Sequence, residues 1–584
     1  MKKLFVSIIF LFSVVLSVQA QSIDTLTIGQ NGNHDFKTIS AAFDSLYNWG
    51  VDNSIILLVT ADYIPDDSLY RETFPITVQD IKGTGADTTI TLKLTDDINV
   101  ILKDSADCIF YLDNAKHFSI YGDGRLNIVN ENYANGTAGI RLYGSCDDIV
   151  IDGCNIVAEI ADSQSYGILV ECHFGEYPIV LSNNNISRAI FGLFVMDDSD
   201  KNGRDIIIDG NSIGDVRDGY HITSCGICVS VVNSHNWGSN RFVVSDNKIF
   251  SVMGGDLPTG ITVYDGSGTI SNNLIIDIVN NNGQAHGPDA AYGMIIMSSN
   301  DSVECYNNMI SHVAAGNAYG IYTHTVSSLS EFYYNSIYLC EDNSQYLENV
   351  TKSYCFLIDG LDKGSRFFMK NNILLNNFGD IYGQPVTDAT CLGIRNVADD
   401  LVPLLNNKMN ITHNIFYADE MEDGYPVFNM TSDSVYWYYD ISAWNTMNND
   451  TTNYDLNPVF TSTSLLMIAE SNALGTPIEG ITADYFGTER NQWHPDIGAC
   501  EIANHGISNF ADEISLKAYY SNGNIKVSSD KMLEGDMYVV DMAGRVVAYN
   551  RIYGTSAEIP FSGKSGVYVV VIAGKTNVSR KIFI

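Results

Sequence analysis

The stretch Asp205-Ile-Ile-Ile-Asp-Gly-Asn-Ser-Ile213 recurs, with the same order of residue types, through the middle of the chain. Each copy is a short run of β-branched and aromatic residues that ends in Asn-x-Ile. The Asn residues of these copies are Asn184, Asn211, Asn247, Asn273, Asn308, Asn335 and Asn371. The isoleucines two places further on are separated by 27, 36, 26, 35, 27 and 36 residues. A constant kernel at variable spacing is typical of solenoid coils whose loops carry insertions.

A second strand-like run lies between successive kernels and is often opened by glycine. Examples are Tyr166-Gly-Ile-Leu-Val170 and Tyr292-Gly-Met-Ile-Ile296. Each repeat therefore holds at least two short strands and no helical periodicity. One such coil cannot bury its inward face alone, whereas stacked coils form a continuous apolar column. The repeat predicts an all-β fold, a right-handed parallel β-helix.

The recurrent Asn stands where each strand turns. Asn tolerates left-handed backbone, and its amide can bond to the Asn of the next coil, so we interpret the series as a structural Asn ladder. Sugar binding by these side chains is the alternative interpretation. An open solenoid end exposes strand edges, and the amphipathic segment 41–46 is expected to form a helix that caps the N-terminal end.

The ends and the charge of the chain suggest an exported protein. Residues 1–20 have a Lys-Lys start, an apolar stretch and a Val-Gln-Ala cleavage site, as a signal peptide does. No later segment reaches about 18 apolar residues, so no transmembrane helix is expected. The net charge of −37 disfavours nucleic-acid binding.

Cysteines number eleven, an odd count for an exported chain, which leaves the disulfide pattern open. Cys225 and Cys228 have the spacing of a redox or zinc pair. In a strand these positions are expected to face opposite sides, so we interpret them as small buried hydrophobic residues.

Three stretches resemble secreted right-handed β-helix proteins of Bacteroidetes-type bacteria. The opening contains Asp35-Phe-Lys-Thr-Ile39 and Tyr70-Arg-Glu72, and the exit contains Trp444 and Pro495-Asp-Ile-Gly-Ala-Cys-Glu501. The tail, with Val540-Asp-Met-Ala-Gly-Arg-Val546 and a final Lys581-Ile-Phe-Ile584, is similar to the sorting domain of type IX secretion. Trp444 is interpreted as end packing, with a sugar platform as the alternative.

The resemblance implies a pectate-lyase-like solenoid, a small C-terminal β-sandwich, and export through the type IX machinery to the outer-membrane surface or the medium. We divide the chain into six parts. The signal peptide spans residues 1–20, the N-terminal cap with the first coils 21–130, the central coils 131–420 and the last coils 421–502. A linker, 503–513, leads to the sorting domain, 514–584.

An acidic loop is the best-defined candidate metal site. Its order D-x-D-x-N-G, followed by two further aspartates, resembles the start of a calcium loop. The candidate ligands are Asp198, Asp200, Asn202, Asp205 and Asp209. The alternative is a solvated turn between strands. Arg188, Arg204 and Arg217 lie near this loop in the sequence. They are interpreted as surface arginines, with the base of a polysaccharide lyase as the alternative.

No catalytic residues can be selected from the sequence, because its 69 Asp and Glu residues offer too many carboxylate pairs. Asp152 and Asp209 share a repeat position, but the coil between them carries Ser182 there. The preferred hypothesis is a surface or secreted protein that binds extracellular glycan or acts as an adhesin. The alternative is a polysaccharide lyase or glycoside hydrolase.

Overall fold

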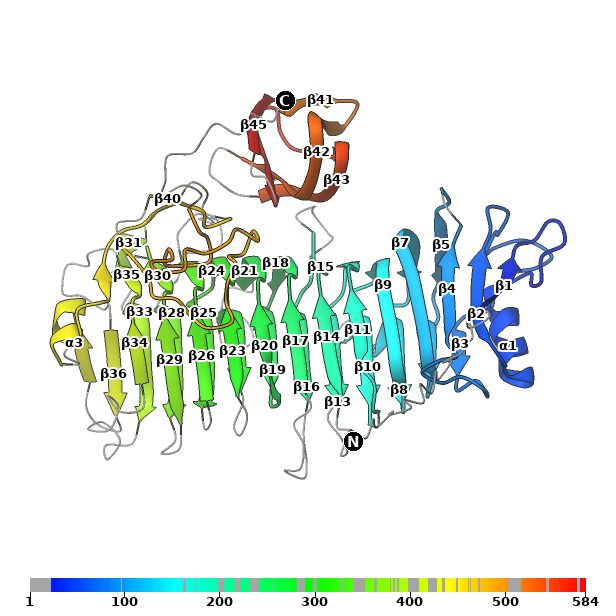
Figure 1. The fold of residues 1–584 in the computed structure, drawn as a ribbon, viewed down its shortest axis with the longest axis horizontal. Coiled ribbons are helices and arrows are strands. Elements are labelled where there is room, and N and C mark those ends of the chain that lie inside the picture. Colours follow the sequence, from blue (N-terminus) through cyan, green and yellow to red (C-terminus); the bar gives the residue numbers. More distant parts are fainter. Residues whose placement is uncertain are drawn as a thin grey trace, which may run out of the picture.

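The computed structural model is an elongated parallel β-helix with a helix at one end and a second, smaller β unit packed on its side (Figure 1). It describes residues 23–502 and 516–584, apart from residues 96, 161–163, 174, 198–203, 216–220, 232–240, 256, 281–288, 298–301, 327–328, 340–351, 362–364, 379, 382–383, 386–387, 398–408, 419–427, 433–435, 448–449, 461, 463, 471–472, 542–545 and 575–577. The predicted signal peptide and linker lie outside the described residues. The prediction of an all-β solenoid is confirmed.

Two long sheets form the solenoid. Sheet A has 23 strands: β1 (Ile23–Ile28), β2 (Ser54–Val59), β4 (Ile90–Leu94), β5 (Val100–Asp104), β7 (Lys116–Asn130), β9 (Asp147–Ala158), β11 (Ile179–Ser182), β12 (Asn185–Ser187), β14 (Asp205–Asp209), β15 (Ser212–Ile213), β17 (Arg241–Ser245), β18 (Lys248–Gly254), β20 (Ser267–Ser271), β21 (Leu274–Asn280), β23 (Val303–Tyr306), β24 (Met309–Ala314), β26 (Leu329–Tyr333), β27 (Ser336–Leu339), β29 (Arg366–Lys370), β30 (Ile373–Asn376), β34 (Met409–Thr412), β35 (Ile415–Ala418) and β38 (Tyr454–Asp455).

Sheet B has 13 strands: β3 (Ile76–Gln79), β6 (Cys108–Asp113), β8 (Thr137–Gly144), β10 (Ser165–Cys172), β13 (Phe191–Asp197), β16 (Cys225–Val231), β19 (Thr259–Tyr264), β22 (Ala290–Met297), β25 (Asn317–Val326), β28 (Lys352–Leu361), β33 (Asp388–Val397), β36 (Phe428–Ser432) and β37 (Tyr436–Tyr439). A typical coil supplies one strand to sheet B and then two short strands to sheet A. Neighbouring coils pair in parallel, so equivalent residues form columns along the axis.

A glycine column explains the glycines of the repeat. Its members are Gly139, Gly167, Gly192, Gly226, Gly260, Gly293 and Gly320. A Cβ atom at any of them would lie 2.2 to 2.7 Å from the Cγ2 of an isoleucine on the facing strand. All of those isoleucines except Ile156 end an Asn-x-Ile kernel, so the two sequence signals are the two sides of one close contact across the core.

Buried Asn side chains form the ladder. The side-chain nitrogen Nδ2 of Asn273, for example, donates to Oδ1 of Asn308 at 2.9 Å, and Nδ2 of Asn247 donates to Oδ1 of Asn273 at 3.0 Å. The same bond links consecutive members of the series Asn184, Asn211, Asn247, Asn273, Asn308, Asn335, Asn372, Asn414 and Asn453.

Two details of the predicted ladder are wrong. The left-handed residue is the one before the ladder Asn, such as Asn272 with φ of 54°, at every ladder position except Asn453, and the ladder Asn is selected for its hydrogen bonds instead. In addition, Asn371 is not a member. It is itself the left-handed residue, with φ of 60°, and the register places Asn372 above Asn335. Asn371 instead bonds to the backbone of Thr476 through both side-chain atoms, at 2.7 and 2.9 Å.

A helix covers the N-terminal end, as predicted. Helix α1 (Ile39–Trp49) begins after Thr38, whose hydroxyl accepts from the Ala41 amide at 3.1 Å. The buried Glu72 carboxylate accepts from the backbone amides of Ile39 and Ser40 at 2.7 and 3.0 Å. The Tyr-Arg-Glu stretch therefore supplies an anion to the positive end of this helix.

The chain turns back after helix α3 (Ile441–Met447). We call residues 456–502 the return segment, which contains the strand pair β39 (Val459–Phe460) and β40 (Ile468–Glu470) and lies along the outer side of sheet A. Its Ile468 and Ile497 pack on Ile373 and Ile415 of sheet A. A short antiparallel pair, β31 (Asp380–Ile381) and β32 (Gln384–Pro385), projects from one coil.

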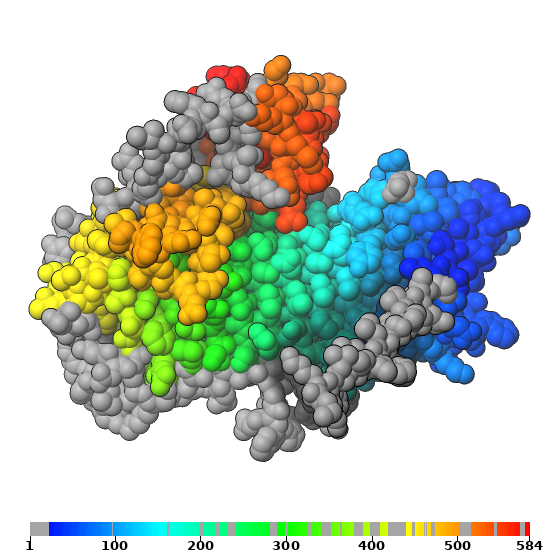
Figure 2. Space-filling model, viewed as in Figure 1, coloured from blue at the N-terminus to red at the C-terminus, as the bar shows by residue number. Residues whose placement is uncertain are grey.

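The C-terminal unit is an antiparallel sheet curled into a half-barrel, with its own core. Its strands are β41 (Leu516–Ser521), β42 (Asn524–Val540), β43 (Val546–Pro560), β44 (Val567–Gly574) and β45 (Val578–Phe583). Figure 2 shows it above the return segment, which lies against the yellow and green coils. A shared apolar cluster with Phe250 and Tyr538 joins the parts, beside an ion pair of 3.1 Å between Lys248 and Asp536.

Candidate functional site

Stacked tyrosines stand on the outer face of sheet B. Tyr292, Tyr319 and Tyr354 occupy the same position on the adjacent strands β22, β25 and β28. Neighbouring ring centroids are 4.8 and 5.9 Å apart, with interplanar angles of 10° and 8°. Both separations are close to the spacing of parallel strands, about 4.8 Å, so the register itself creates the stack. We call these three residues, together with Tyr322, His324, Asp359 and Arg395, the tyrosine patch.

Tyr322 and His324 extend the stack toward solvent. The Tyr322 ring packs against Tyr292 and Tyr319 at 5.6 and 5.9 Å, and the His324 ring stacks on Tyr322 at 6.1 Å and 14°. Tyr319 and Tyr354 are buried, whereas Tyr292 and Tyr322 are half-buried and the His324 side chain is 49% exposed. The patch therefore has a fixed apolar base and an accessible aromatic edge.

Asp359 connects the aromatic edge to a charge pair. It accepts from the Tyr322 hydroxyl at 2.7 Å and from Arg395 Nη2 at 2.8 Å, and it also contacts Asn396. Burial alone would raise the pKa of Asp359, but the hydrogen bonds from Arg395 and Tyr322 outweigh it, so this pKa lies below its usual value. Burial raises the pKa of Tyr292 to about 12. At neutral pH the site presents neutral phenols beside a carboxylate and a guanidinium, which can accept and donate hydrogen bonds.

Further exposed side chains follow the same column of sheet B. One column of register partners on sheet B carries a large exposed side chain on every second strand. These side chains are Tyr143, Met196 and Tyr264, which are 42%, 44% and 40% exposed. The pairing of Ile296 with Thr323 places His324 one residue further, in the same column. We call Tyr143, Met196, Tyr264 and His324 the exposed lane. Its members recur at about 9.6 Å, two strand spacings, along the solenoid axis.

The predicted calcium ligands do not converge within the described residues. Asp198, Asp200 and Asn202 lie outside them. Asp205 and Asp209 stand at the two ends of β14, so their Cα atoms are about 13 Å apart at the usual rise of a strand. Asp209 accepts from the Ser245 hydroxyl at 2.6 Å. Among the described residues, no group of three His, Cys, Asp or Glu side chains could hold a metal ion.

Arg204, beside this loop, is not a surface arginine, and that interpretation was wrong. Its side chain is fully buried and pairs with the equally buried Asp197 at 2.5 Å. It also donates to the carbonyl of Cys146. Since Asp197 and Arg204 flank residues 198–203, this pair ties the two ends of the loop together. Arg188 pairs with Glu159 at 2.5 Å, and Arg217 lies outside the described part of the chain.

The Cys225 and Cys228 side chains lie on the same face, contrary to the expectation from strand alternation. Gly226, where a Cβ atom would lie 2.7 Å from Cγ2 of Ile249, and Ile227 both face the core, so strand alternation is interrupted between them. The two cysteines therefore align with Phe191 and Phe194 on the outer side of sheet B, and the Cys225 thiol donates to the Ile227 carbonyl at 3.2 Å.

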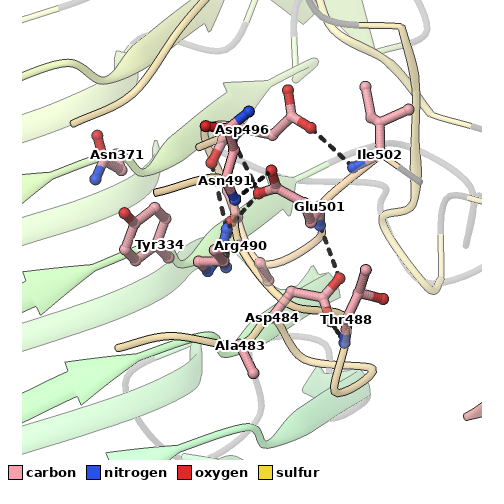
Figure 3. Close-up of polar contacts among 12 residues, drawn as sticks. Tyr334, Asn371, Ala483, Asp484, Thr488, Arg490, Asn491, Asp496, Glu501 and Ile502 are labelled. Atoms are coloured by element: carbon pink, nitrogen blue, oxygen red, sulfur yellow. Dashed lines mark hydrogen bonds and ion pairs between the residues drawn. The ribbon is translucent and has the colours of Figure 1, made fainter. Parts of the chain in front are cut away.

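A buried ionic network lies in the return segment (Figure 3). Arg490 donates to Asn307 at 2.8 Å and lies 3.8 Å above the Tyr334 ring, and Glu501 is within 3.4 Å of its guanidinium. Asp484 accepts from the Glu501 amide at 2.7 Å.

The network is structural, because its polar atoms bond the return segment to itself and to sheet A. Asp496 and Glu501 belong to the Pro-Asp-Ile-Gly-Ala-Cys-Glu stretch of the exit.

Trp444, also from the exit, is buried in the solenoid core and has too little exposed surface for a sugar platform.

The tyrosine patch was not identified from the sequence, although a signal for it exists. Aromatic residues stand directly before the column glycines, as in Tyr166-Gly, Phe191-Gly, Tyr292-Gly and Tyr319-Gly. Since the glycine faces inward, the residue before it faces outward. The charge pair has no such signal, because Asp359 and Arg395 are 36 residues apart and meet only through the register.

A scan against protein-family models matches none, and a search of curated proteins returns no significant match. No helix in the described part of the chain is both long and apolar enough to cross a membrane.

Proposed function

We propose that the protein is an exported β-helix that binds an extended extracellular glycan on the outer face of sheet B. The observation that carries the proposal is the stack of tyrosines whose exposed edge meets the Asp359–Arg395 pair. A sugar ring has apolar C–H groups and a hydroxyl rim, so an accessible aromatic edge beside fixed polar groups suits it. The exposed lane continues this chemistry along the axis, which suits a polymer better than a single sugar.

A glycan array followed by calorimetry tests this function. Tyr322→Ala removes the ring that links the stack to Asp359 and is expected to weaken binding by about 10- to 100-fold, or about 1.4 to 2.8 kcal/mol. The matched control is Tyr121→Ala, because Tyr121 is 37% exposed on β7 of sheet A. Equal losses in both variants would contradict the assignment to sheet B. If no glycan binds at all, the adhesin alternative is favoured.

Export through the type IX route is part of the proposal. It is supported by the signal-peptide pattern of residues 1–20 and by the tail resemblance. Truncation of residues 514–584 is expected to leave the protein in the periplasm, unable to cross the outer membrane. Surface labelling of the truncated protein would contradict this route.

A second candidate function is glycoside hydrolysis by a carboxylate pair on sheet A. Glu304 and Glu331 are register partners on the adjacent strands β23 and β26. Adjacent strands lie about 4.8 Å apart, close to the carboxyl separation of about 5 to 5.5 Å in retaining glycosidases. Burial and the neighbouring Glu331 raise the pKa of Glu304, and the Tyr333 hydroxyl donates to Glu331 at 2.8 Å.

A reducing-end assay on acidic and neutral polysaccharides tests the second candidate. Hydrolysis predicts new reducing ends with the wild type and at least a 1000-fold loss, about 4 kcal/mol, in Glu304→Gln and Glu331→Gln. Products formed equally by these variants would remove the pair from consideration.

A further inference from the structure

The glycine column of sheet B ends in two cysteines. Tyr319, Tyr354 and Thr390 are register partners, and so are Ile321, Phe356 and Leu392. The residues between them, Gly320, Cys355 and Cys391, therefore occupy one column on the strands β25, β28 and β33.

A side chain fits at these two coils because the facing residue changes. Gly320 faces Ile337, whose Cγ2 would lie 2.5 Å from a Cβ atom. One coil further, the register partner of Ile337 is Leu374, and the next is Phe416. Neither residue is branched at Cβ, so the methyl group that forces glycine elsewhere is absent. The replacement of glycine by cysteine is thus matched by a change across the core.

The two thiols are fully buried and are neighbours in the register. Neither Cys355 nor Cys391 has exposed surface, and the Cys391 thiol donates to the carbonyl of Tyr417 at 3.1 Å. Equivalent residues of adjacent strands have Cα atoms about 4.8 Å apart, within the range of about 4.4 to 6.8 Å that a disulfide spans. Cys225 and Cys228 lie within one strand, so a bond between them would not join two coils.

We propose that Cys355 and Cys391 form a disulfide that staples β28 to β33. The oxidant is a low-molecular-weight disulfide, which is reduced to two thiols while the cysteines lose their two hydrogens and gain the S–S bond. Because burial raises the pKa of Cys355, its thiolate forms before the coil closes around it, so the exchange takes place during folding. The same two strands carry Asp359 and Arg395, so the staple fixes the charge pair of the tyrosine patch. Formation of the bond does not depend on glycan binding.

Peptide mapping of the full chain tests the proposal. The protein is refolded with glutathione disulfide, alkylated in denaturant and digested with trypsin. Residues 353–363 and 371–395 are separate tryptic peptides, each with one cysteine. We expect them as one cross-linked species, about 2 Da lighter than the sum of the free peptides. Alkylation of both cysteines in the refolded wild type, or a cross-link of either to another cysteine, would overturn the proposal.

Variants connect the bond to stability. Reductant is expected to lower the unfolding temperature of the wild type and of Cys500→Ser, the control, since Cys500 lies in the return segment. It should leave that of Cys355→Ser unchanged. If Cys355→Ser does not fold, the wild-type peptide map decides alone. An equal shift in Cys355→Ser would show that the reductant acts elsewhere.

Discussion

The Asn ladder makes the most quantitative prediction, for Asn273→Ala in the middle of the solenoid. The side-chain nitrogen Nδ2 of Asn273 donates to the carbonyl of Val244 at 2.9 Å, and its Oδ1 accepts from the Asn247 backbone amide at 3.1 Å. Truncation leaves both groups without this partner in a fully buried site. At about 1 to 3 kcal/mol for each unsatisfied group, the expected loss is about 2 to 6 kcal/mol.

Urea unfolding and hydrogen exchange measure this loss together, because a solenoid need not unfold in one step. Exchange should accelerate most in peptides that cover residues 242–280. The matched control is Asn185→Ala, an exposed neighbour of the ladder, which is expected to change stability by about 0.5 kcal/mol or less. A loss below about 1 kcal/mol in Asn273→Ala, with unchanged exchange, would refute the ladder's contribution to stability.

Three further predictions concern packing, the C-terminal unit and pH. Gly260→Ala is expected to cost about 1 to 3 kcal/mol in thermal unfolding, because its Cβ would lie 2.6 Å from Cγ2 of Ile275; an unchanged unfolding temperature would contradict the contact. Asp536→Asn leaves the buried Lys248 unpaired and should cost about 3 kcal/mol, measured by urea unfolding, whereas addition of Lys248→Met should restore most of it. Burial lowers the pKa of His413, so its contribution to stability is complete above the ordinary value of 6.5 and is lost as pH falls below it; His413→Gln should flatten the unfolding profile below pH 6.5.

The solenoid could be predicted from the sequence because its coils repeat one contact pattern. The Asn-x-Ile kernel and the column glycine face each other in most coils, so both recur often enough to be visible in the sequence. The one-residue error at Asn371 arose because Asn371 and Asn372 are adjacent, and only the pairing of Ile337 with Leu374 decides between them.

The candidate site was less predictable, because its residues are joined by register across long loops. Asp359 and Arg395 are ordinary residues in the sequence, and become a pair only when β28 lies beside β33. Strand alternation also failed at Cys225 and Cys228, since Gly226 and Ile227 both face the core and leave both thiols on the outer side. Arg204 was misjudged for a similar reason: its partner Asp197 lies across a loop.

Glycan-dependent hydroxyl-radical footprinting tests the central claim most directly. The wild-type protein is oxidised with and without a glycan that it binds on the array, and modified peptides are quantified by mass spectrometry. Binding along sheet B predicts protection of Tyr264, Tyr322 and His324, and no change at Tyr121 on sheet A. Protection confined to sheet A or to the C-terminal half-barrel would contradict the account.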